Sequence, residues 1–212
     1  MLTVNEVFFS IQGEGSRAGR PCVFVRLTGC PLRCVWCDTA YAFHEGVRRD
    51  EAELAAELQR FPARLLCLTG GEPLAQPGAF PFVARLLDEG WEVVVETSGH
   101  VPLRPLDPRA VAIVDVKTPG SGESARMEWE NLDRLRAADE VKFVIDGRAD
   151  YEWAREVVLG RQLAARCTVL FSPVHGVLDP GTLGRWILDD GLAVRLQVQL
   201  HKVLWPGVAR GV

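Results

Sequence analysis

Three cysteines close together along the chain give the strongest chemical signal in this sequence. Cys30, Cys34 and Cys37 follow the spacing C-x3-C-x2-C. Thiolates this close are usually metal ligands, because one short loop can wrap several sulfurs around one centre. A structural zinc site closes with four ligands, whereas a cluster held by three cysteines leaves one iron free to bind a small molecule. The spacing therefore predicts an iron–sulfur cluster with an open iron; a zinc-stabilised binding module completed by His44 is the alternative.

The composition is that of an ordinary globular protein and excludes several classes. The chain has 212 residues, of which 48% are hydrophobic and 25% charged, and we expect one domain over residues 1–212. A net charge of −4 argues against a nucleic-acid partner, which would need clustered positive charge. No apolar run approaches the roughly 20 residues that span a bilayer. Because Met1 leads straight into a strand-like segment, we expect no signal peptide, a cytoplasmic location and no membrane partner.

Hydrophobic periodicity predicts alternating strands and helices. We expect helices at 50–60 (capped by Asp50), 78–88, 129–137, 150–159 and 180–189. We expect strands at 4–9, 22–27, 64–68, 91–95, 111–116, 140–145, 168–172 and 193–200, with a loop over the prolines of 102–108.

This order predicts an α/β fold with a mostly parallel sheet covered by helices. The strands appear as continuous apolar runs, which is typical of strands buried on both faces. Six or so βα units are too few for a closed eight-stranded barrel, so we expect an open, partial (β/α)6-type barrel. In such folds the chemistry lies at the carboxyl ends of the strands, where the cysteine loop and the other polar motifs fall.

Five further motifs make the cysteine pattern specific. They are I-Q-G-E-G-S-R-A-G-R-P at 11–21, C-D-T at 37–39, T-G-G-E-P at 69–73, E-T-S-G at 96–99 and Q-L-H-K at 199–202. The cysteine spacing, with Trp36 before the last cysteine, resembles the radical S-adenosylmethionine (SAM) superfamily. The full set resembles the 7-carboxy-7-deazaguanine synthase family over about residues 4–206. The resemblance implies a 4Fe–4S cluster, SAM and Mg²⁺ as cofactors.

The resemblance also implies a reaction and partners. Family members convert 6-carboxy-5,6,7,8-tetrahydropterin to 7-carboxy-7-deazaguanine with loss of ammonia, in the queuosine (7-deazapurine) pathway. A homodimer and an electron donor such as flavodoxin are implied as well. A second kind of radical enzyme, an activase that installs a glycyl radical on a partner protein, stays open as an alternative, although it gives no reason for Q-G-E-G or C-D-T.

The resemblance assigns the SAM site to the cysteine loop and to several strand ends. The glycines of 69–73 would let the backbone approach the amino group of SAM, which a Cβ would obstruct. Glu96 or Ser98 would meet the ribose hydroxyls, and Trp36 would pack on the adenine. The assigned SAM contacts are Trp36, Cys37, Asp38, Gly71, Glu96, Ser98, Asp115, Val116, Lys117, Ser172, Pro173, Val174 and His175.

The resemblance places the pterin against Ile11, Gln12, Gly13, Arg26 and Thr69. Amide and backbone groups can satisfy the donor–acceptor edge of a pterin, and a guanidinium suits its carboxylate. Roles for Glu14 and His201 stay open.

Thr39 has two interpretations. From the residues alone, a threonine after an aspartate predicts a turn or a helix cap. The resemblance instead assigns its hydroxyl to Mg²⁺, an ion that accepts few protein ligands when substrate and water complete its shell. Some family members end at a proline whose carboxylate touches the ligand. Pro206 is followed here by Gly207 to Val212, so that contact is not carried over.

Lysine is rare in this chain. Of 24 basic residues only Lys117, Lys142 and Lys202 are lysines, and we predict that all three lie at or within strands. An ammonium is a compact point charge and differs from the planar fork of arginine. We therefore expect these sites to need an ammonium, in the order Lys117, Lys202, Lys142; residual surface lysines are the alternative. Cys22, Cys67 and Cys167 fall in strand-like segments and are expected to be packed thiols.

Overall fold

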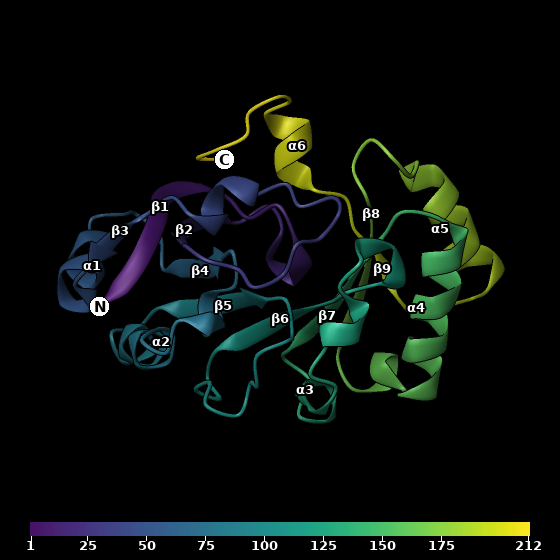
Figure 1. Cartoon of the computed structure of the whole chain (residues 1–212), viewed down its shortest axis with the longest axis horizontal. Coiled ribbons are helices and arrows are strands. Elements are labelled where there is room, and N and C mark those ends of the chain that lie inside the picture. The colour runs from purple at the N-terminus through teal and green to yellow at the C-terminus, as the bar shows by residue number, and fades with distance from the viewer.

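The computed structural model describes residues 1–212 and contains nine strands and six α-helices (Figure 1). The strands are β1 (Leu2–Ile11), β2 (Pro21–Leu27), β3 (Val47–Arg49), β4 (Leu65–Gly70), β5 (Glu92–Thr97), β6 (Val111–Val116), β7 (Glu140–Ile145), β8 (Thr168–Pro173) and β9 (Arg195–Leu196). The helices are α1 (Glu51–Leu58), α2 (Ala79–Asp88), α3 (Glu130–Asp133), α4 (Arg148–Gly160), α5 (Pro180–Asp189) and α6 (Leu200–Leu204).

All nine strands form one sheet, in the order β3-β1-β2-β4-β5-β6-β7-β8-β9. From β2 to β9 each neighbouring pair is parallel. β1 runs antiparallel to both β2 and β3. Because β3 and β9 are free edges, the sheet does not close, and the predicted open partial barrel with a mostly parallel sheet is confirmed.

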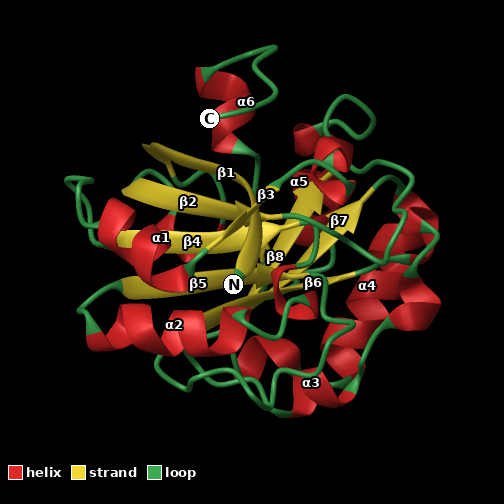
Figure 2. Ribbon diagram, turned by 60° about the vertical axis from the view of Figure 1, so that its left-hand side comes forward, coloured by secondary structure: helices red, strands yellow, loops and turns green.

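Helices α1 to α5 cover the outer face of the curved sheet, whereas α6 stands over its other side (Figures 1 and 2). Alternation along each strand separates the two faces. In β2, for example, Val23, Val25 and Leu27 pack outward against α1 and α2. Phe24 belongs to a smaller inner cluster, and Arg26 lines a cavity. We had predicted strands buried on both faces, but the inner face is polar toward the carboxyl ends of the strands.

Local sequence signals predicted most elements of the sheet and its outer helices. The predicted cap of α1 is confirmed, because Asp50 Oδ1 accepts hydrogen bonds from the backbone N–H groups of Ala52 and Glu53, at 2.8 and 3.2 Å. The predicted loop at 102–108 contains no helix or strand. No helix is both long and apolar enough to cross a membrane.

Two predicted elements are wrong in extent. The helix expected at 129–137 ends at Asp133, because the Arg136 N–H bonds to the Asp139 carboxylate, at 2.9 Å, instead of continuing a helix. The strand expected at 193–200 pairs only at Arg195 and Leu196 and then gives way to α6. His201 and Lys202 therefore lie on a short helix and not on a strand. The prediction that all three lysines lie at or within strands is wrong for Lys202.

Candidate active site

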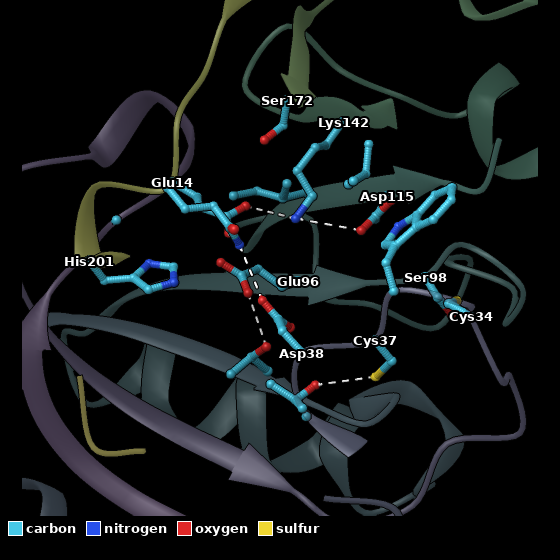
Figure 3. Close-up of a pocket in the computed structure, with 18 of the residues that line it drawn as sticks. Glu14, Cys34, Cys37, Asp38, Glu96, Ser98, Asp115, Lys142, Ser172 and His201 are labelled. Carbon is cyan, nitrogen blue, oxygen red and sulfur yellow. Dashed lines mark hydrogen bonds and ion pairs between the residues drawn. The ribbon is translucent and has the colours of Figure 1, made fainter. Parts of the chain in front are cut away.

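One cavity of about 430 Å³ opens on the inner face of the sheet, at the carboxyl ends of the parallel strands. It gathers the cysteine loop, the 11–14 loop, the glycine-rich turn and α6, which are far apart in the sequence (Figure 3). All but one of the residues expected to bind the cluster, SAM, the pterin or Mg²⁺ line this cavity. The lining residues are Ile11, Gln12, Gly13, Arg26, Cys30, Cys34, Trp36, Cys37, Asp38, Thr39, Thr69, Gly71, Glu96, Ser98, Asp115, Lys117, Ser172, Pro173, Val174 and His175.

Val116 is the exception, and strand geometry explains it. Along β6, Val114 and Val116 point outward into the core beneath α3 and α4, and Val116 is fully buried. Asp115 and Lys117 point inward and line the cavity. Because side chains alternate along a strand, only the backbone of Val116 can contribute to a ligand site.

The cysteine loop is pinned at several points to the rest of the fold. Its entry is tied to the glycine-rich turn by the bond from the Glu72 N–H to the Gly29 carbonyl, at 2.7 Å. Its middle is tied to the loop after β6, where the Val35 N–H bonds to the Ser121 carbonyl, at 3.1 Å. The loop is thus a fixed platform for its three thiols.

The thiols themselves are free and partly buried, as cluster ligands need to be. Cys30, Cys34 and Cys37 form no disulfide and are each intermediate in exposure. Burial raises the pKa of Cys30 and Cys34, and the nearby Lys117 ammonium opposes that rise. Coordination by a metal deprotonates a thiol outright.

The zinc alternative lacks its fourth ligand. His44 is exposed and lies outside the cavity lining. No three His, Cys, Asp or Glu side chains converge as ligands of a single ion do. All three loop cysteines, in contrast, line the cavity.

The glycine-rich turn serves the cysteine loop directly. A Cβ on Gly71 would lie 2.1 Å from the Gly29 carbonyl oxygen and 3.0 Å from the Cβ of Cys30. A Cβ on Gly70 would lie 2.7 Å from the Leu27 carbonyl oxygen. The structure shows that these glycines make room for the chain that carries the cysteines. Both also line the cavity, and their expected approach to SAM stays a prediction.

Ser98 is held by the buried Glu72. The Glu72 carboxylate accepts bonds from the Ser98 N–H (2.7 Å), the Ser98 hydroxyl (2.6 Å) and the Thr97 hydroxyl (2.9 Å). The Ser98 oxygen also lies 2.7 Å from Nδ1 of His100. Since its hydroxyl proton is already donated, Ser98 can meet a ribose hydroxyl only as an acceptor.

The residues expected to bind the pterin come from the 11–14 loop and the ends of β2 and β4. Gln12 is buried, and its amide nitrogen has no hydrogen-bond partner, so it is a donor available to a ligand. Arg26 Nε donates to Glu6 Oε1 at 2.8 Å, and the Arg26 side chain still lines the cavity. A Cβ on Gly13 would lie 2.4 Å from Nδ1 of His201, so α6 packs directly on this loop.

A line of alternating charges crosses the cavity, and the sequence did not predict it. Lys142 Nζ lies 2.8 Å from Glu14 Oε2 and 3.5 Å from Asp115 Oδ2, and Lys117 Nζ lies 3.0 Å from Asp115 Oδ2. Burial acts to raise the pKa of Glu14 and Asp115, but the lysines outweigh it and lower both values. These contacts join loops and strands distant in the chain, and the only signal for them was the rarity of lysine.

Glu96 belongs to this group rather than to Ser98. Its Oε2 accepts a bond from the Thr69 hydroxyl at 3.0 Å, and burial followed by repulsion from Glu14 raises its pKa. It therefore lies beside Thr69, one of the expected pterin residues, and its expected contact with SAM stays a prediction. Two adjacent carboxyl groups, Glu14 and Glu96, thus have pKa values displaced in opposite directions.

All three lysines of the chain line the cavity. The third, Lys202 on α6, lies 3.0 Å from Asp38 Oδ2 on the cysteine loop. The three lysines are therefore gathered at one site, and the need for an ammonium at each stays a prediction.

The structural cysteines are separate from the cavity. Cys22 and Cys67 are fully buried and Cys167 nearly so, as predicted for packed thiols. Burial raises the pKa of Cys22 to about 12 and that of Cys167 to about 11, so both stay protonated at neutral pH.

Thr39 precedes a short 3₁₀ turn, Ala40–Phe43, but its hydroxyl makes no capping hydrogen bond. The predicted turn is confirmed, since Thr39 lies in a turn at the N-cap position, but its side chain does not act as a cap. The hydroxyl lines the cavity 3.8 Å from the Cys37 sulfur, where it is available to a ligand.

Proteins of known family resemble this chain over its whole length, including the residues of the cavity. The model of the radical SAM superfamily matches residues 24–116. The chain is 45% identical to 7-carboxy-7-deazaguanine synthase of Koribacter versatilis, with 100% of both chains covered. It is 42% identical to that of Chlorobaculum tepidum, over 100% of this chain and 97% of the relative. The crystal structure of QueE from Escherichia coli superimposes with a TM-score of 0.78 at 25% identity, over 94% of each chain. With the three-cysteine loop, the polar cavity and full-length likeness all in agreement, this chain belongs to the 7-carboxy-7-deazaguanine synthase family of radical SAM enzymes.

Proposed function

We propose that this protein converts 6-carboxy-5,6,7,8-tetrahydropterin to 7-carboxy-7-deazaguanine with loss of ammonia, as a radical SAM lyase of 7-deazapurine biosynthesis. One observation carries the proposal. A single cavity brings the three-cysteine loop opposite unpaired polar groups, the Gln12 amide nitrogen and Asp115 Oδ1, which are buried without partners. Buried polar atoms without partners are uncommon, and at a cavity wall they indicate a polar ligand.

The cofactor assignments follow from the lining. Cys30, Cys34 and Cys37 would hold the 4Fe–4S cluster, and the residues around Trp36, Asp115 and Lys117 would receive SAM. When bound, these two cofactors supply the radical chemistry that removes a hydrogen atom from the pterin. Asp115 Oδ1 is an acceptor suited to the ammonium of SAM, and Lys117 is a point charge suited to its carboxylate.

The chain's own contribution is to bind, orient and exclude water. The Gln12 amide and the backbone of Gly13 suit the donor–acceptor edge of the pterin, while Arg26 suits its carboxylate. The apolar side chains of Phe8, Phe24 and Ile113 line the same cavity and would strengthen every polar contact made there.

Thr39 would supply a single neutral oxygen to Mg²⁺, with the pterin carboxylate and water completing the shell. Its hydroxyl lines the cavity and is not used as a helix cap, which supports this assignment. The ion would supply a positive charge suited to the pterin carboxylate.

A homodimer and an electron donor such as flavodoxin are carried from the family resemblance. A cytoplasmic location and a single domain over residues 1–212 are carried from the sequence. The continuous sheet of nine strands supports the single domain. Size-exclusion chromatography with light scattering tests the dimer.

The test of the function begins with anaerobic reconstitution. We expect a brown protein with about four iron and four sulfide per chain, and SAM cleavage that depends on added pterin. A colourless protein with one zinc per chain would contradict the proposal in favour of a binding module. SAM cleavage that needs a polypeptide and ignores the pterin would favour an activase.

A further inference from the structure

Lys142 joins the two halves of the cavity. It lies on the inner face of β7, in register with Asp115 on β6. Its ammonium reaches Glu14 on one side and Asp115 on the other, at 2.8 and 3.5 Å, and its side chain is 12% exposed (Figure 3). Glu14 ends the 11–14 loop, which is expected to hold the pterin. Asp115 is paired with Lys117, which is expected to bind SAM.

Lys142 is the only firmly charged cation that faces Glu14. Glu96 faces this carboxylate from β5, Asp38 from the cysteine loop and His201 from α6. Burial lowers the pKa of His201, which is therefore neutral at neutral pH. The remaining partners of Glu14 are neutral amides, with Gln199 Nε2 at 2.9 Å and Gln197 Nε2 at 3.1 Å.

We propose that Lys142 is a positioning residue whose ammonium holds the Glu14 carboxylate beside the pterin-binding loop and ties it to Asp115 on the SAM side. This inference rests on the proposed function, since it takes the 11–14 loop as the pterin site. The ionised Glu14 carboxylate accepts hydrogen bonds from the donor groups of the pterin. Lys142 does not contact the ligand and affects binding only through Glu14.

The sign of the effect follows from the local charges. Burial is the largest influence on Glu14 and raises its pKa, but attraction and hydrogen bonding to Lys142 outweigh it, so the pKa lies below the ordinary value. Without Lys142 the influence of burial and of the neighbouring carboxylates remains, and the pKa rises above the ordinary value. A ligand that needs the ionised carboxylate loses affinity as the pH falls. In the variant without Lys142 this loss begins at a higher pH than in the parent.

The experiment measures equilibrium binding of 6-carboxypterin, a fluorescent pterin at a stable oxidation level, to the reconstituted protein between pH 5 and 8. The variants are Lys142→Met, Lys142→Arg, Glu14→Gln and the double change Lys142→Met/Glu14→Gln. Ionisation of the probe is common to all of them and cancels in the comparison. Cluster absorbance and the thermal midpoint confirm that each variant is folded and loaded.

We expect Lys142→Met to lose affinity relative to the parent as the pH falls from 8 to 5, and the loss should approach tenfold for each pH unit below the raised pKa of Glu14. Lys142→Arg keeps the positive charge, so the pH dependence of its affinity should equal that of the parent. The larger arginine side chain can lower the affinity at every pH without changing that dependence. With Glu14→Gln in place, Lys142→Met should add little. In turnover, the pterin KM of Lys142→Met should rise more at pH 6 than at pH 8.

Three results would overturn the inference. These are an unchanged pH dependence in Lys142→Met, a uniform loss of affinity at every pH, and a shift in Lys142→Arg equal to that in Lys142→Met. A uniform loss means that the lysine touches the ligand directly. If the parent itself binds no pterin, the proposed function fails, which is a separate outcome from failure of Lys142 alone.

Discussion

The Glu72 carboxylate receives both the backbone N–H and the hydroxyl of Ser98, at 2.7 and 2.6 Å. Glu72 is fully buried, and its own N–H bonds to the Gly29 carbonyl at the start of the cysteine loop. One residue of the glycine-rich turn therefore connects the cysteine loop to the end of β5. The turn is a structural junction as well as part of the cavity wall.

Replacing Glu72 by glutamine should destabilise the protein. The amide keeps the shape but can accept at only one of its two positions, so a buried donor loses its partner at a cost of about 2–3 kcal/mol. Anaerobic denaturant unfolding measures the loss. Glu89→Gln removes a more exposed carboxylate, paired with Arg85, and should change the unfolding free energy by less than about 0.5 kcal/mol. Equal losses in the two variants would contradict this role of Glu72.

Single alanine replacements should divide the six cysteines into two groups. Loss of Cys30, Cys34 or Cys37 should abolish turnover and lower the iron content, because each is needed to hold the cluster. Loss of Cys22, Cys67 or Cys167, which are buried thiols, should leave iron and turnover in place and cost about 1–2 kcal/mol of stability. Iron analysis and turnover measure the division. A loop cysteine that can be removed with both properties intact would disprove it.

Thr39→Val should remove the effect of Mg²⁺ and little else. Valine keeps the volume of threonine but lacks the oxygen, and the hydroxyl makes no capping bond whose loss would unfold the turn. Stimulation of turnover by Mg²⁺ should therefore fall, while iron content and SAM binding stay with the parent. A Thr39→Val variant with the parent's Mg²⁺ response would refute the assignment.

Lys117→Arg should weaken SAM binding or turnover at least tenfold, about 1.4 kcal/mol, although the charge is kept. The Lys117 ammonium lies 3.0 Å from Asp115 Oδ2, and its side chain is only 16% exposed. A guanidinium is larger and planar, so it cannot place a compact charge at the same point. Titration with SAM measures the change, and iron content controls for an intact cluster. A Lys117→Arg variant with full SAM affinity and turnover would show that this site does not need an ammonium, and the scarcity of lysine would then be a coincidence.

The parts predictable from sequence were those with local causes. Apolar runs between turn residues identified six of the parallel strands, and Asp50 identified the start of α1. Cysteine spacing identified the loop on which the cavity is built. Strand alternation alone would also have shown that Asp115 and Lys117 share a face from which Val116 is excluded.

The parts that escaped prediction depend on contacts between distant segments. The alternation of Val194, Leu196, Val198 and Leu200 resembles a strand, but the chain leaves the sheet after Leu196. It does so where the Gln197 side chain accepts a bond from the Gly15 N–H, at 2.5 Å across the sheet opening. The same turn brings α6 onto Gly13, and no local pattern shows that Glu14, Lys142 and Asp115 meet there.

The central claim is that this cavity turns a pterin into a deazapurine, and product analysis tests it most directly. The reconstituted protein is incubated anaerobically with 6-carboxy-5,6,7,8-tetrahydropterin, SAM, Mg²⁺ and a reductant, and the products are analysed by mass spectrometry. We expect a new species with the mass of 7-carboxy-7-deazaguanine, one ammonia released for each, and neither product from the Cys34→Ala variant. A fully loaded, SAM-cleaving protein that leaves the pterin unchanged would contradict the account.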